Sequence, residues 1–497
     1  MTAPHGGGHI ALPSLAAGAL LALSLPPWGW WPLGLAGAGL FAWRLAGQPL
    51  RTRLSSGWLT GIGCYGLGLM WARAFNWYGA LMLILLQALF MAAAGGLTPS
   101  GRGRSVALVA AGTLTEAVRM TWPFGGLPLG GIFLGQADGP LVELARLGGP
   151  LLITAGIWAG GVGGAMLVAA AKSGRRLDGS GVWAGLAVLA GLTILIVAGT
   201  VGPDGGSPLR SITVALVQGG GPRGLNKEQV APATVFDAQV AATEQFSRHH
   251  RAPDLVLWPE DVIALDRGLT GSPEALLMSH LAAKMHTTLV AGVTEPAPGN
   301  SFRNEIVAWG PHGSIVSVFE KVHRVPFGEY VPFRAFFSHV ADLSLVPSDA
   351  VPGRGTGLMR TPAGPLGALV SFEVFYADRS RPSVRAGAQL LVVPTNTSSY
   401  RAAQVPTQEL AADVVQAVQT GRDLVQAAPT GYSTVVTQRG QVLQRSLLGP
   451  RQVLEATVAL RRGLTLYDHL GDPPLLVLAS LALISGWTRQ RRTRVYS

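Results

Sequence analysis

Long apolar runs joined by short polar connections fill the first 202 residues, and one more apolar run lies near the end of the chain. A helix needs about 20 mostly apolar residues to cross a bilayer. We predict a transmembrane helix in each of eight runs, of which the last is short: His9–Leu25, Trp31–Gly47, Ser55–Ala72, Gly79–Leu97, Ser105–Trp122, Gly149–Ala171, Val182–Val201 and Pro473–Trp487. The first run has no basic segment before it and is followed at once by others, so we interpret it as a retained helix and not as a signal peptide.

The segment 203–472 has a different pattern, in which short β-branched or apolar runs alternate with polar stretches of helical character. Strands are predicted to begin at Ile212, Asp254, Thr287, Asn304, Ser314, Leu366 and Gln389, and helices to cover Gln229–His249, Pro273–His286 and Gln404–Leu424. This alternation predicts a layered α/β domain with one core. The sequence Gln438-Arg439-Gly440 predicts a hairpin turn between two late strands.

The patterns divide the chain into three parts. Residues 1–202 form an N-terminal membrane domain of about seven transmembrane helices, 203–472 the α/β domain, and 473–497 a C-terminal transmembrane helix with a basic cytoplasmic tail. Charged residues make up only 13% of the chain, against about 25% in soluble proteins, which agrees with a membrane protein. The one cysteine, Cys64, lies in an apolar run, so neither a disulfide framework nor a thiolate metal site is predicted, and we expect no cofactor.

The net charge of +11 reflects membrane topology and not nucleic-acid binding, because the basic residues cluster in short connections between apolar runs. With a cytoplasmic N-terminus, every cluster falls on the cytoplasmic side: Arg44, Arg51, Arg53, Arg102, Arg104, Lys172, Arg175, Arg176, Arg489, Arg491, Arg492 and Arg494. The same alternation places residues 203–472 outside the cytoplasm.

Three polar residues at strand ends of the α/β domain are candidates for catalysis. Glu260 follows an apolar strand and a proline, where loss of water raises a carboxyl pKa and suits a general base. Lys321 ends another strand and can stabilise an oxyanion. Ser371 and Glu373 stand two apart in the apolar stretch from Leu366, so strand alternation predicts that they share a face. Taken singly, each also fits a structural role.

The chain resembles the bacterial apolipoprotein N-acyltransferases, membrane proteins of the nitrilase superfamily. The resemblance runs over nearly the whole length, through LTEAVRMTWPFGGLPL, VALVQG, LWPE, EKVHRVPFGEYVPF, PTNTSSY and QTGRDLVQAAPTGYSTVV. It implies a four-layer αββα nitrilase domain attached to a bundle of transmembrane helices in the bacterial inner membrane. The implied reaction moves an acyl chain from a phospholipid to the enzyme, and then to the amine of a diacylglyceryl-cysteine in an apolipoprotein.

The resemblance also implies roles for individual residues. Glu260 is the expected base, Lys321 the transition-state lysine, and Glu329 and Glu373 the supporting carboxylates. The family's nucleophile is a cysteine followed by a tyrosine, whereas this chain has Ser371 followed by Phe372, which we expect to take those two places. A serine hydroxyl ionises far less readily than a thiol. Two alternatives therefore stay open: an amidase-like hydrolase tethered to the membrane, and a disarmed relative that binds lipid or lipoprotein.

The topology can be tested with reporter fusions. A reporter inserted after Asn300 is expected to report the extracytoplasmic side, and one fused after Ser497 the cytoplasmic side, because the basic clusters fix the orientation. If both reporters gave the same side, the eighth predicted transmembrane helix would be wrong.

Overall fold

The computed structural model describes residues 8–172, 180–221, 230–339, 343–344, 346–400 and 403–495. The chain divides into two compact units, one of residues 1–202 with 469–497 and the other of residues 203–468. Arg175, Arg176 and Gln229, which entered the predictions above, lie outside the described residues.

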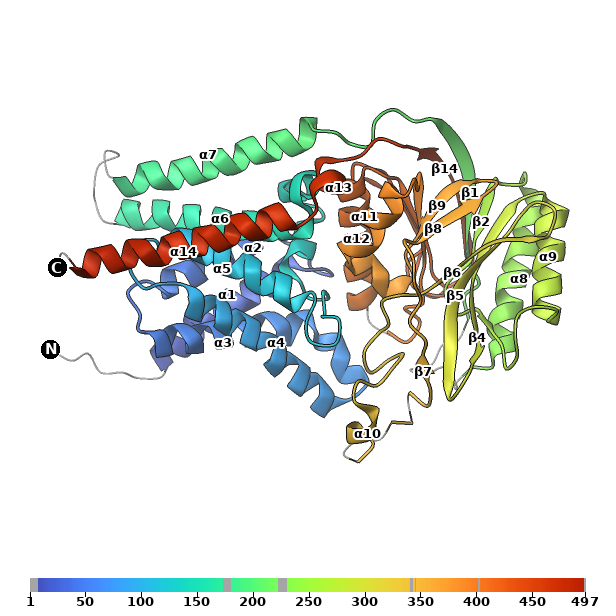
Figure 1. Cartoon of the computed structure of the whole chain (residues 1–497), viewed down its shortest axis with the longest axis horizontal. Helices are drawn as coiled ribbons and strands as arrows, with labels where there is room; N and C mark the ends of the chain where they lie inside the picture. The colour runs from blue at the N-terminus through green and yellow to red at the C-terminus, as the bar shows by residue number, and fades with distance from the viewer. Residues whose placement is uncertain are drawn as a thin grey trace. The chain divides into compact units, whose positions relative to one another are not determined.

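The first unit is helical (Figure 1). Its α-helices are α1 (Gly8–Ser24), α2 (Trp31–Arg44), α3 (Leu50–Gly68), α4 (Trp77–Leu97), α5 (Arg104–Arg119), α6 (Ala145–Lys172), α7 (Ser180–Val201) and α14 (Pro473–Val495). Short 3-10 helices lie between them at η1 (Met70–Ala74), η2 (Ile132–Gln136) and η3 (Pro140–Leu144). Each of the eight predicted runs thus corresponds to a helix.

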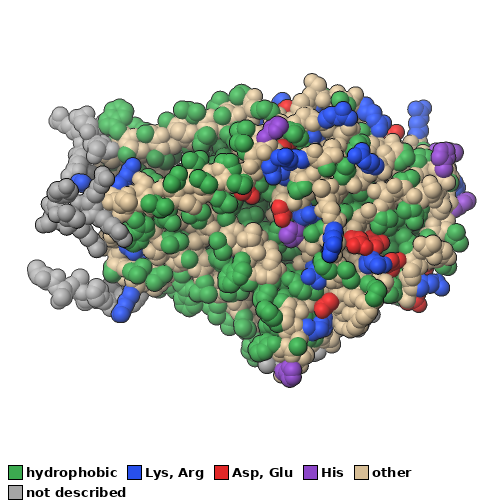
Figure 2. All heavy atoms as spheres, in the orientation of Figure 1, with side chains coloured by type: hydrophobic (Ala, Val, Ile, Leu, Met, Phe, Trp, Pro, Cys, Tyr) green, Lys and Arg blue, Asp and Glu red, His purple; other side chains and the backbone are tan. Residues whose placement is uncertain are grey.

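Helix length and composition decide which of these helices can cross a bilayer. Among the described residues, three helical stretches are long and apolar enough: Trp77–Leu97, Pro140–Lys172 and Gly181–Val201. Helix α2 has 14 residues and is about 21 Å long, less than the roughly 30 Å of a bilayer core. Figure 2 shows mostly hydrophobic side chains on the visible face of this unit. The chain is thus a membrane protein, while the full count of eight spans stays a prediction.

A buried ion pair interrupts the apolar interior of the helical unit. Arg119 and Glu116 stand one turn apart on α5, and Arg119 Nη2 lies 2.7 Å from Glu116 Oε1. Arg119 also donates hydrogen bonds to the backbone oxygens of Leu127 and Leu129. Buried charges are costly unless they are paired and hydrogen-bonded, and both conditions are met here.

The second unit contains two β-sheets. The first has the strand order β14-β1-β2-β4-β5-β6, with β3 paired to β4 and β7 to β5. Its strands are β1 (Arg210–Gln218), β2 (Leu255–Leu257), β3 (Ile263–Ala264), β4 (Thr288–Ala297), β5 (Ser301–Trp309), β6 (Ile315–Glu320), β7 (Asp349–Ala350) and β14 (Gln452–Leu460). Strands β1, β2 and β4 run parallel, so their carboxyl ends meet at one edge.

The second sheet has the order β13-β12-β11-β10-β9-β8. Its strands are β8 (Leu358–Thr361), β9 (Gly364–Ala368), β10 (Leu390–Pro394), β11 (Leu424–Ala427), β12 (Thr434–Val436) and β13 (Val442–Arg445). Strands β9, β10 and β11 are parallel, and β12 and β13 form the predicted hairpin around Gly440. Gly440 has φ +78°, which a glycine adopts without strain.

The two sheets pack face to face with helices outside them. Val214 and Leu216 of β1 belong to a core that also contains Leu390 and Val392 of β10, whereas the alternate residues Ala215 and Val217 face the helices. Helices α8 (Pro232–His249) and α9 (Pro273–Met285) cover the first sheet, and α11 (Ala377–Arg385) and α12 (Gln404–Thr420) cover the second (Figure 1). Two short helices, α10 (Arg334–Phe337) and α13 (Leu466–Leu470), lie in connections. This αββα arrangement confirms the predicted fold class.

One predicted strand is wrong at its end. The stretch from Leu366 was expected to continue as a strand through Glu373, but β9 ends at Ala368 and Ser371–Phe375 form a 3-10 turn, η5. Ser371 has φ +49°, a value that a strand does not allow. Ser371 and Glu373 therefore do not share a strand face, and their relation is set by the turn.

Candidate active site

Glu260 is held at the carboxyl end of β2 by contacts with both sheets. The backbone N–H of Trp258 donates to Val290 O at 2.8 Å, and that of Glu260 lies 3.4 Å from Thr395 O, just after β10. The carboxylate is only 4% exposed. Glu260 was predicted to lie at a strand end with little water around it, and the structure confirms this position.

Gly292 of β4 makes room for this loop. A Cβ at Gly292 would lie 2.4 Å from Glu260 Cα and 2.7 Å from Pro259 O, closer than atoms can approach. The Gly292 N–H donates to Pro259 O at 3.0 Å. The absence of a side chain therefore allows β4 to support the backbone that carries Glu260.

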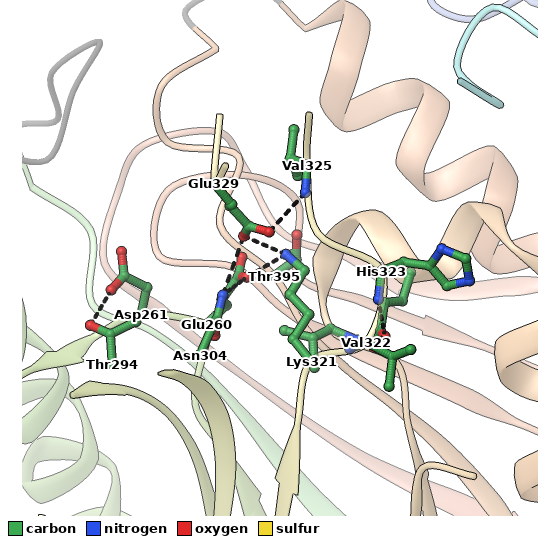
Figure 3. A network of polar contacts seen from close by, with 12 residues as sticks. Glu260, Asp261, Thr294, Asn304, Lys321, Val322, His323, Val325, Glu329 and Thr395 are labelled. Atoms are coloured by element: carbon green, nitrogen blue, oxygen red, sulfur yellow. Dashed lines mark hydrogen bonds and ion pairs between the residues drawn. The ribbon is translucent and has the colours of Figure 1, made fainter. Parts of the chain in front are cut away.

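Lys321 follows directly after β6, and its backbone N–H donates to Asn304 O on β5 at 2.9 Å. Its ammonium is 1% exposed and lies between two carboxylates (Figure 3). Lys321 Nζ is 2.8 Å from Glu260 Oε1 and 2.7 Å from Glu329 Oε1. The lysine that the sequence predicted thus lies in contact with the predicted base.

Asn304 donates hydrogen bonds to the same two carboxylates. Its Nδ2 donates to Glu260 Oε1 at 2.8 Å and to Glu329 Oε1 at 3.3 Å. Glu329 is fixed further by its Oε2, which accepts the Val325 N–H at 2.9 Å. We refer to Glu260, Asn304, Lys321 and Glu329 as the carboxylate–lysine network.

The electrostatics of this network follow from its burial. Burial raises the pKa of Glu260, Lys321 opposes that rise and Glu329 adds to it, so that the pKa ends above its ordinary value. For Lys321, burial acts to lower the pKa, but Glu260 and Glu329 outweigh it and raise the pKa. Lys321 is therefore a permanent cation at neutral pH, and Glu260 binds a proton more readily than an exposed glutamate does.

Ser371 begins the turn that follows β9. Its φ of +49° is unfavourable for a residue with a side chain, and strained conformations of this kind cluster at functional sites. Ser371 is partly exposed, and among the described residues its hydroxyl makes no hydrogen bond with Glu260 or Lys321. The predicted base and lysine are thus in contact, whereas the predicted nucleophile is not hydrogen-bonded to either.

Glu373 links the Ser371 turn to the Lys321 loop. Its Oε2 accepts the N–H of Val370, next to Ser371, at 2.9 Å. Its Oε1 accepts the N–H groups of Val322 and His323, the two residues after Lys321, at 2.8 and 3.0 Å. The carboxylate is fully buried and has Arg379 Nε 3.4 Å away. Glu373 is therefore a positioning residue for both segments.

Phe372 points into an aromatic cluster under the turn. Its ring centroid is 5.1 Å from that of Tyr376 and 6.1 Å from that of Phe375, and the side chain is 7% exposed. His323 also stacks on Tyr376, with ring centroids 4.2 Å apart. This packing supports the turn that presents Ser371.

A cavity of about 170 Å³ opens beside the network. Its polar wall includes Glu260, Asp261, Asn304, Glu329, Asn396 and Ser398. Among the described residues, no three His, Cys, Asp or Glu side chains lie close enough to hold a metal ion. Glu260 therefore lies in the wall of a cavity that polar groups of neighbouring residues also line.

Sequence reasoning assigned no role to Asn304 or Asp261. Asn304 carried a usable signal, since it begins an apolar strand segment and a buried amide there needs partners. Asp261 follows Glu260 in the sequence but carried no such signal, because its φ of +56° and its place in the cavity wall are set by the fold.

The fold and site together define a class: an αββα enzyme unit in which a buried glutamate and a buried lysine lie in contact. Residues 213–463 match the carbon–nitrogen hydrolase family, and residues 17–163 match the apolipoprotein N-acyltransferase N-terminal domain. The chain belongs to the carbon–nitrogen hydrolase family, and it is an acyltransferase of that family.

Two apolipoprotein N-acyltransferases and one solved structure are similar to this chain. An apolipoprotein N-acyltransferase of Mycolicibacterium smegmatis is 29% identical over 510 residues, covering 95% of this chain and 84% of that protein. One of Shewanella oneidensis is 27% identical over 518 residues, covering 96% of this chain and 95% of that protein. Among solved structures, Saccharomyces cerevisiae Nit3, a nitrilase-superfamily member, aligns with 51% of this chain and 91% of its own at 18% identity and a TM-score of 0.39.

Substitution of Gly292 tests the support of the base. Gly292→Ala is expected to displace the Glu260 backbone, to lower stability by about 1–3 kcal/mol and to reduce acyl transfer, because the new methyl group overlaps Glu260 Cα. Gly268→Ala is the matched control, since a Cβ there has its nearest neighbour at 4.0 Å. Thermal melts and initial rates measure both effects. Equal behaviour of the two variants would contradict this account.

Substitution of the base and lysine tests the network. Glu260→Gln is expected to reduce acyl transfer by about 10²–10⁴-fold with a melting temperature close to wild type, since the amide is isosteric but cannot accept a proton. Lys321→Ala is expected to abolish transfer and also to destabilise the fold by about 3–5 kcal/mol, because two buried carboxylates lose their cation.

Glu320→Gln is the control for both variants. It makes the same chemical change as Glu260→Gln at the end of β6, where Glu320 pairs with Arg303 away from the network. Its rate and melting temperature are expected to match wild type. If Glu260→Gln kept a rate similar to that of Glu320→Gln, the assignment of Glu260 as base would have to be withdrawn.

Proposed function

We propose that this protein transfers a fatty acyl chain from a membrane phospholipid to the N-terminal amine of a diacylglyceryl-cysteine in apolipoproteins. The observation that carries the proposal is the buried carboxylate–lysine network in an αββα unit whose chain also contains membrane helices. The names of the two full-length relatives supply the substrate class.

In the first half of the reaction, Ser371 Oγ attacks the ester carbonyl carbon of the phospholipid. Glu260 accepts the hydroxyl proton, and the negative charge on the carbonyl oxygen is stabilised by the cation of Lys321. The ester C–O bond then breaks, and the proton passes to the leaving lysophospholipid. The product is an oxyester between the acyl chain and Ser371.

In the second half, the amine nitrogen of the acceptor attacks the same carbonyl carbon. Glu260 takes a proton from the nitrogen and returns it to Ser371 Oγ as the oxyester bond breaks. The amide product leaves, and the serine hydroxyl is restored. Glu260 both accepts and donates a proton in this half-reaction. A carboxyl group does both efficiently when its pKa lies nearer to neutrality, which agrees with the raised pKa of Glu260.

Both substrates are anchored in a lipid bilayer, so we place the enzyme in the bacterial inner membrane as a multi-pass protein. The α/β unit lies on the extracytoplasmic side in this proposal, and the division of the chain into residues 1–202, 203–472 and 473–497 goes with it. The one-sided basic clusters of the sequence support this orientation.

Serine at the nucleophile position favours one further candidate function, that of a disarmed relative that binds lipid or lipoprotein. An oxyester is harder for an amine to cleave than a thioester, so transfer by Ser371 is expected to be slow. The strained turn at Ser371 and the intact network support catalysis instead, since a disarmed protein has no use for a buried base and cation in contact.

The nucleophile can be trapped directly. Incubation with a phospholipid labelled in its acyl chain, followed by peptide mapping, is expected to place label on the peptide containing Ser371. Ser371→Ala is expected to carry no label, and Ser371→Cys to be labelled and to transfer faster, because a thiol forms its nucleophilic anion more readily.

The possible results separate the candidate functions. Label on wild type that appears later on the acceptor amine supports the acyltransferase, and label that is released as free fatty acid despite added acceptor supports the amidase-like hydrolase. No label on wild type, with strong label on Ser371→Cys, would show that the chain is a disarmed relative.

A further inference from the structure

We propose that Glu409 is a positioning residue of the site, which acts through Thr395 and holds the loop after β10 in place beside Glu260. Glu409 is a buried acid of α12 to which the reaction steps give no part. The inference deepens the proposed function, on which it rests, because it concerns how the base is kept in position.

Thr395 connects Glu409 with the base. Its Oγ1 donates to Glu409 Oε1 at 2.5 Å, and its backbone oxygen lies 3.4 Å from the backbone nitrogen of Glu260 (Figure 3). Asn396 and Ser398, which follow Thr395 in the sequence, line the cavity beside Glu260. Glu409 thus holds the first residue of a loop that contacts the backbone of the base and forms part of the cavity wall.

Helix α12 also contacts the turn that carries the nucleophile. Gln416 Nε2 donates to Val374 O of η5 at 2.5 Å. Most residues of α12 are buried, so packing restricts where their side chains can lie. One helix therefore bonds to the loop beside the base and to the turn that follows β9.

The surroundings of Glu409 favour a neutral carboxyl group. The residue is 1% exposed, and its Oε2 is buried without a hydrogen bond among the described residues. Lys321 acts on Glu409 through its charge, but its ammonium is in contact with Glu260 and Glu329 instead. A buried carboxylate without a paired cation is far more costly than a buried neutral carboxyl group.

A second buried acid strengthens this conclusion. Asp413 stands one turn further along the same face of α12, is fully buried, and accepts the hydroxyl of Thr434 on β12 at 2.9 Å. Two neighbouring carboxylates without water repel each other, which favours protonation. Burial raises the pKa of Glu409 to about 8, and the charge of Glu260 adds to the rise. Glu409 is therefore neutral at pH 7 and holds Thr395 without placing another charge near the base.

The test compares Glu409 with Asp413 in the full-length protein. Both are buried carboxyl groups on α12 that accept one threonine hydroxyl, but Thr434 lies on β12 and outside the carboxylate–lysine network. Glu409→Ala is expected to lower kcat roughly ten- to hundredfold, because a small displacement of a reacting group is costly. Asp413→Ala, the matched control, is expected to lower the melting temperature but to keep the rate of the folded protein.

The conservative variant separates positioning from loss of a buried side chain. Glu409→Gln keeps a neutral oxygen that can accept the Thr395 hydroxyl, so it is expected to restore most of the rate that Glu409→Ala loses. A Glu409→Gln variant no faster than Glu409→Ala would overturn the inference.

Hydrogen exchange without substrate measures the position of the loop itself. Glu409→Ala is expected to speed amide exchange roughly tenfold in the peptides that contain Thr395 and Glu260, because the loop opens more often. Glu409→Gln and Asp413→Ala are expected to leave these peptides close to wild type. Equal exchange and equal kcat for Glu409→Ala and Asp413→Ala would contradict the proposal.

The pH dependence of stability tests the neutral form, also if Glu409→Ala does not fold. The charged or titratable groups that act on Glu409 among the described residues are Glu260, Lys321, Asp413 and Tyr400, and Glu409→Gln retains them all. Because folding raises the pKa of Glu409, wild type loses stability as the pH rises from about 4.5 to about 8. Its melting temperature is expected to fall relative to that of Glu409→Gln over this range. A difference that stays constant would overturn the inference.

Exchange and melting need no acyl transfer, so they separate this inference from the proposed function. A wild-type protein that transfers no acyl chain, but whose exchange at Thr395 and Glu260 depends on Glu409, would refute the transferase and retain the positioning role. A wild-type protein that transfers normally, with Glu409→Ala equal to Asp413→Ala in rate and exchange, would do the reverse.

Discussion

The cation of Lys321, held without water between two carboxylates, is the interaction on which the site depends. Taking an ammonium and two carboxylates out of water is expensive, and the cost is offset only if each charge keeps close partners. Lys321 has contacts of 2.7 and 2.8 Å, and Asn304 supplies the same carboxylates with further donors. Glu260 is held by β2 and by Thr395, the residue after β10, whereas Asn304 lies on β5 and Lys321 follows β6. A shift of one sheet relative to the other would therefore disturb the carboxylate–lysine network.

The sequence predicted the layers of the fold because each helix or strand follows from the hydrophobic pattern of its own short stretch of sequence. Alternating apolar strands and helical stretches predicted the α/β unit, and the apolar runs predicted the eight α-helices α1–α7 and α14 of the first unit. It also predicted Glu260 and Lys321 as site residues, from their places after apolar strands together with the family resemblance, since each taken singly also fits a structural role. Their contact with each other was beyond local reasoning, because Glu260 follows β2 and Lys321 follows β6, which are not neighbours in the sheet.

The errors have physical reasons as well. The stretch Leu366–Glu373 is apolar enough to be predicted as a strand, but a backbone turn at positive φ leaves no trace in the hydrophobic pattern. Asp261 was missed for the same reason, since its φ is also positive and its place in the cavity depends on β4. Asp261 and Ser371 both have a positive φ, which is unfavourable for residues with a side chain. Such strain lowers stability, and it is typical of functional sites, where it holds a side chain in a required position.

The way Glu373 holds its two segments has a consequence for how the protein can change over time. Its carboxylate bonds to the main-chain N–H groups of residues 322, 323 and 370 and to none of their side chains. Every amino acid except proline offers that N–H. The three hydrogen bonds themselves therefore do not depend on which side chains stand at those positions. Mutations there act on the site through packing instead, such as the packing of Val370 in the core and of His323 on Tyr376.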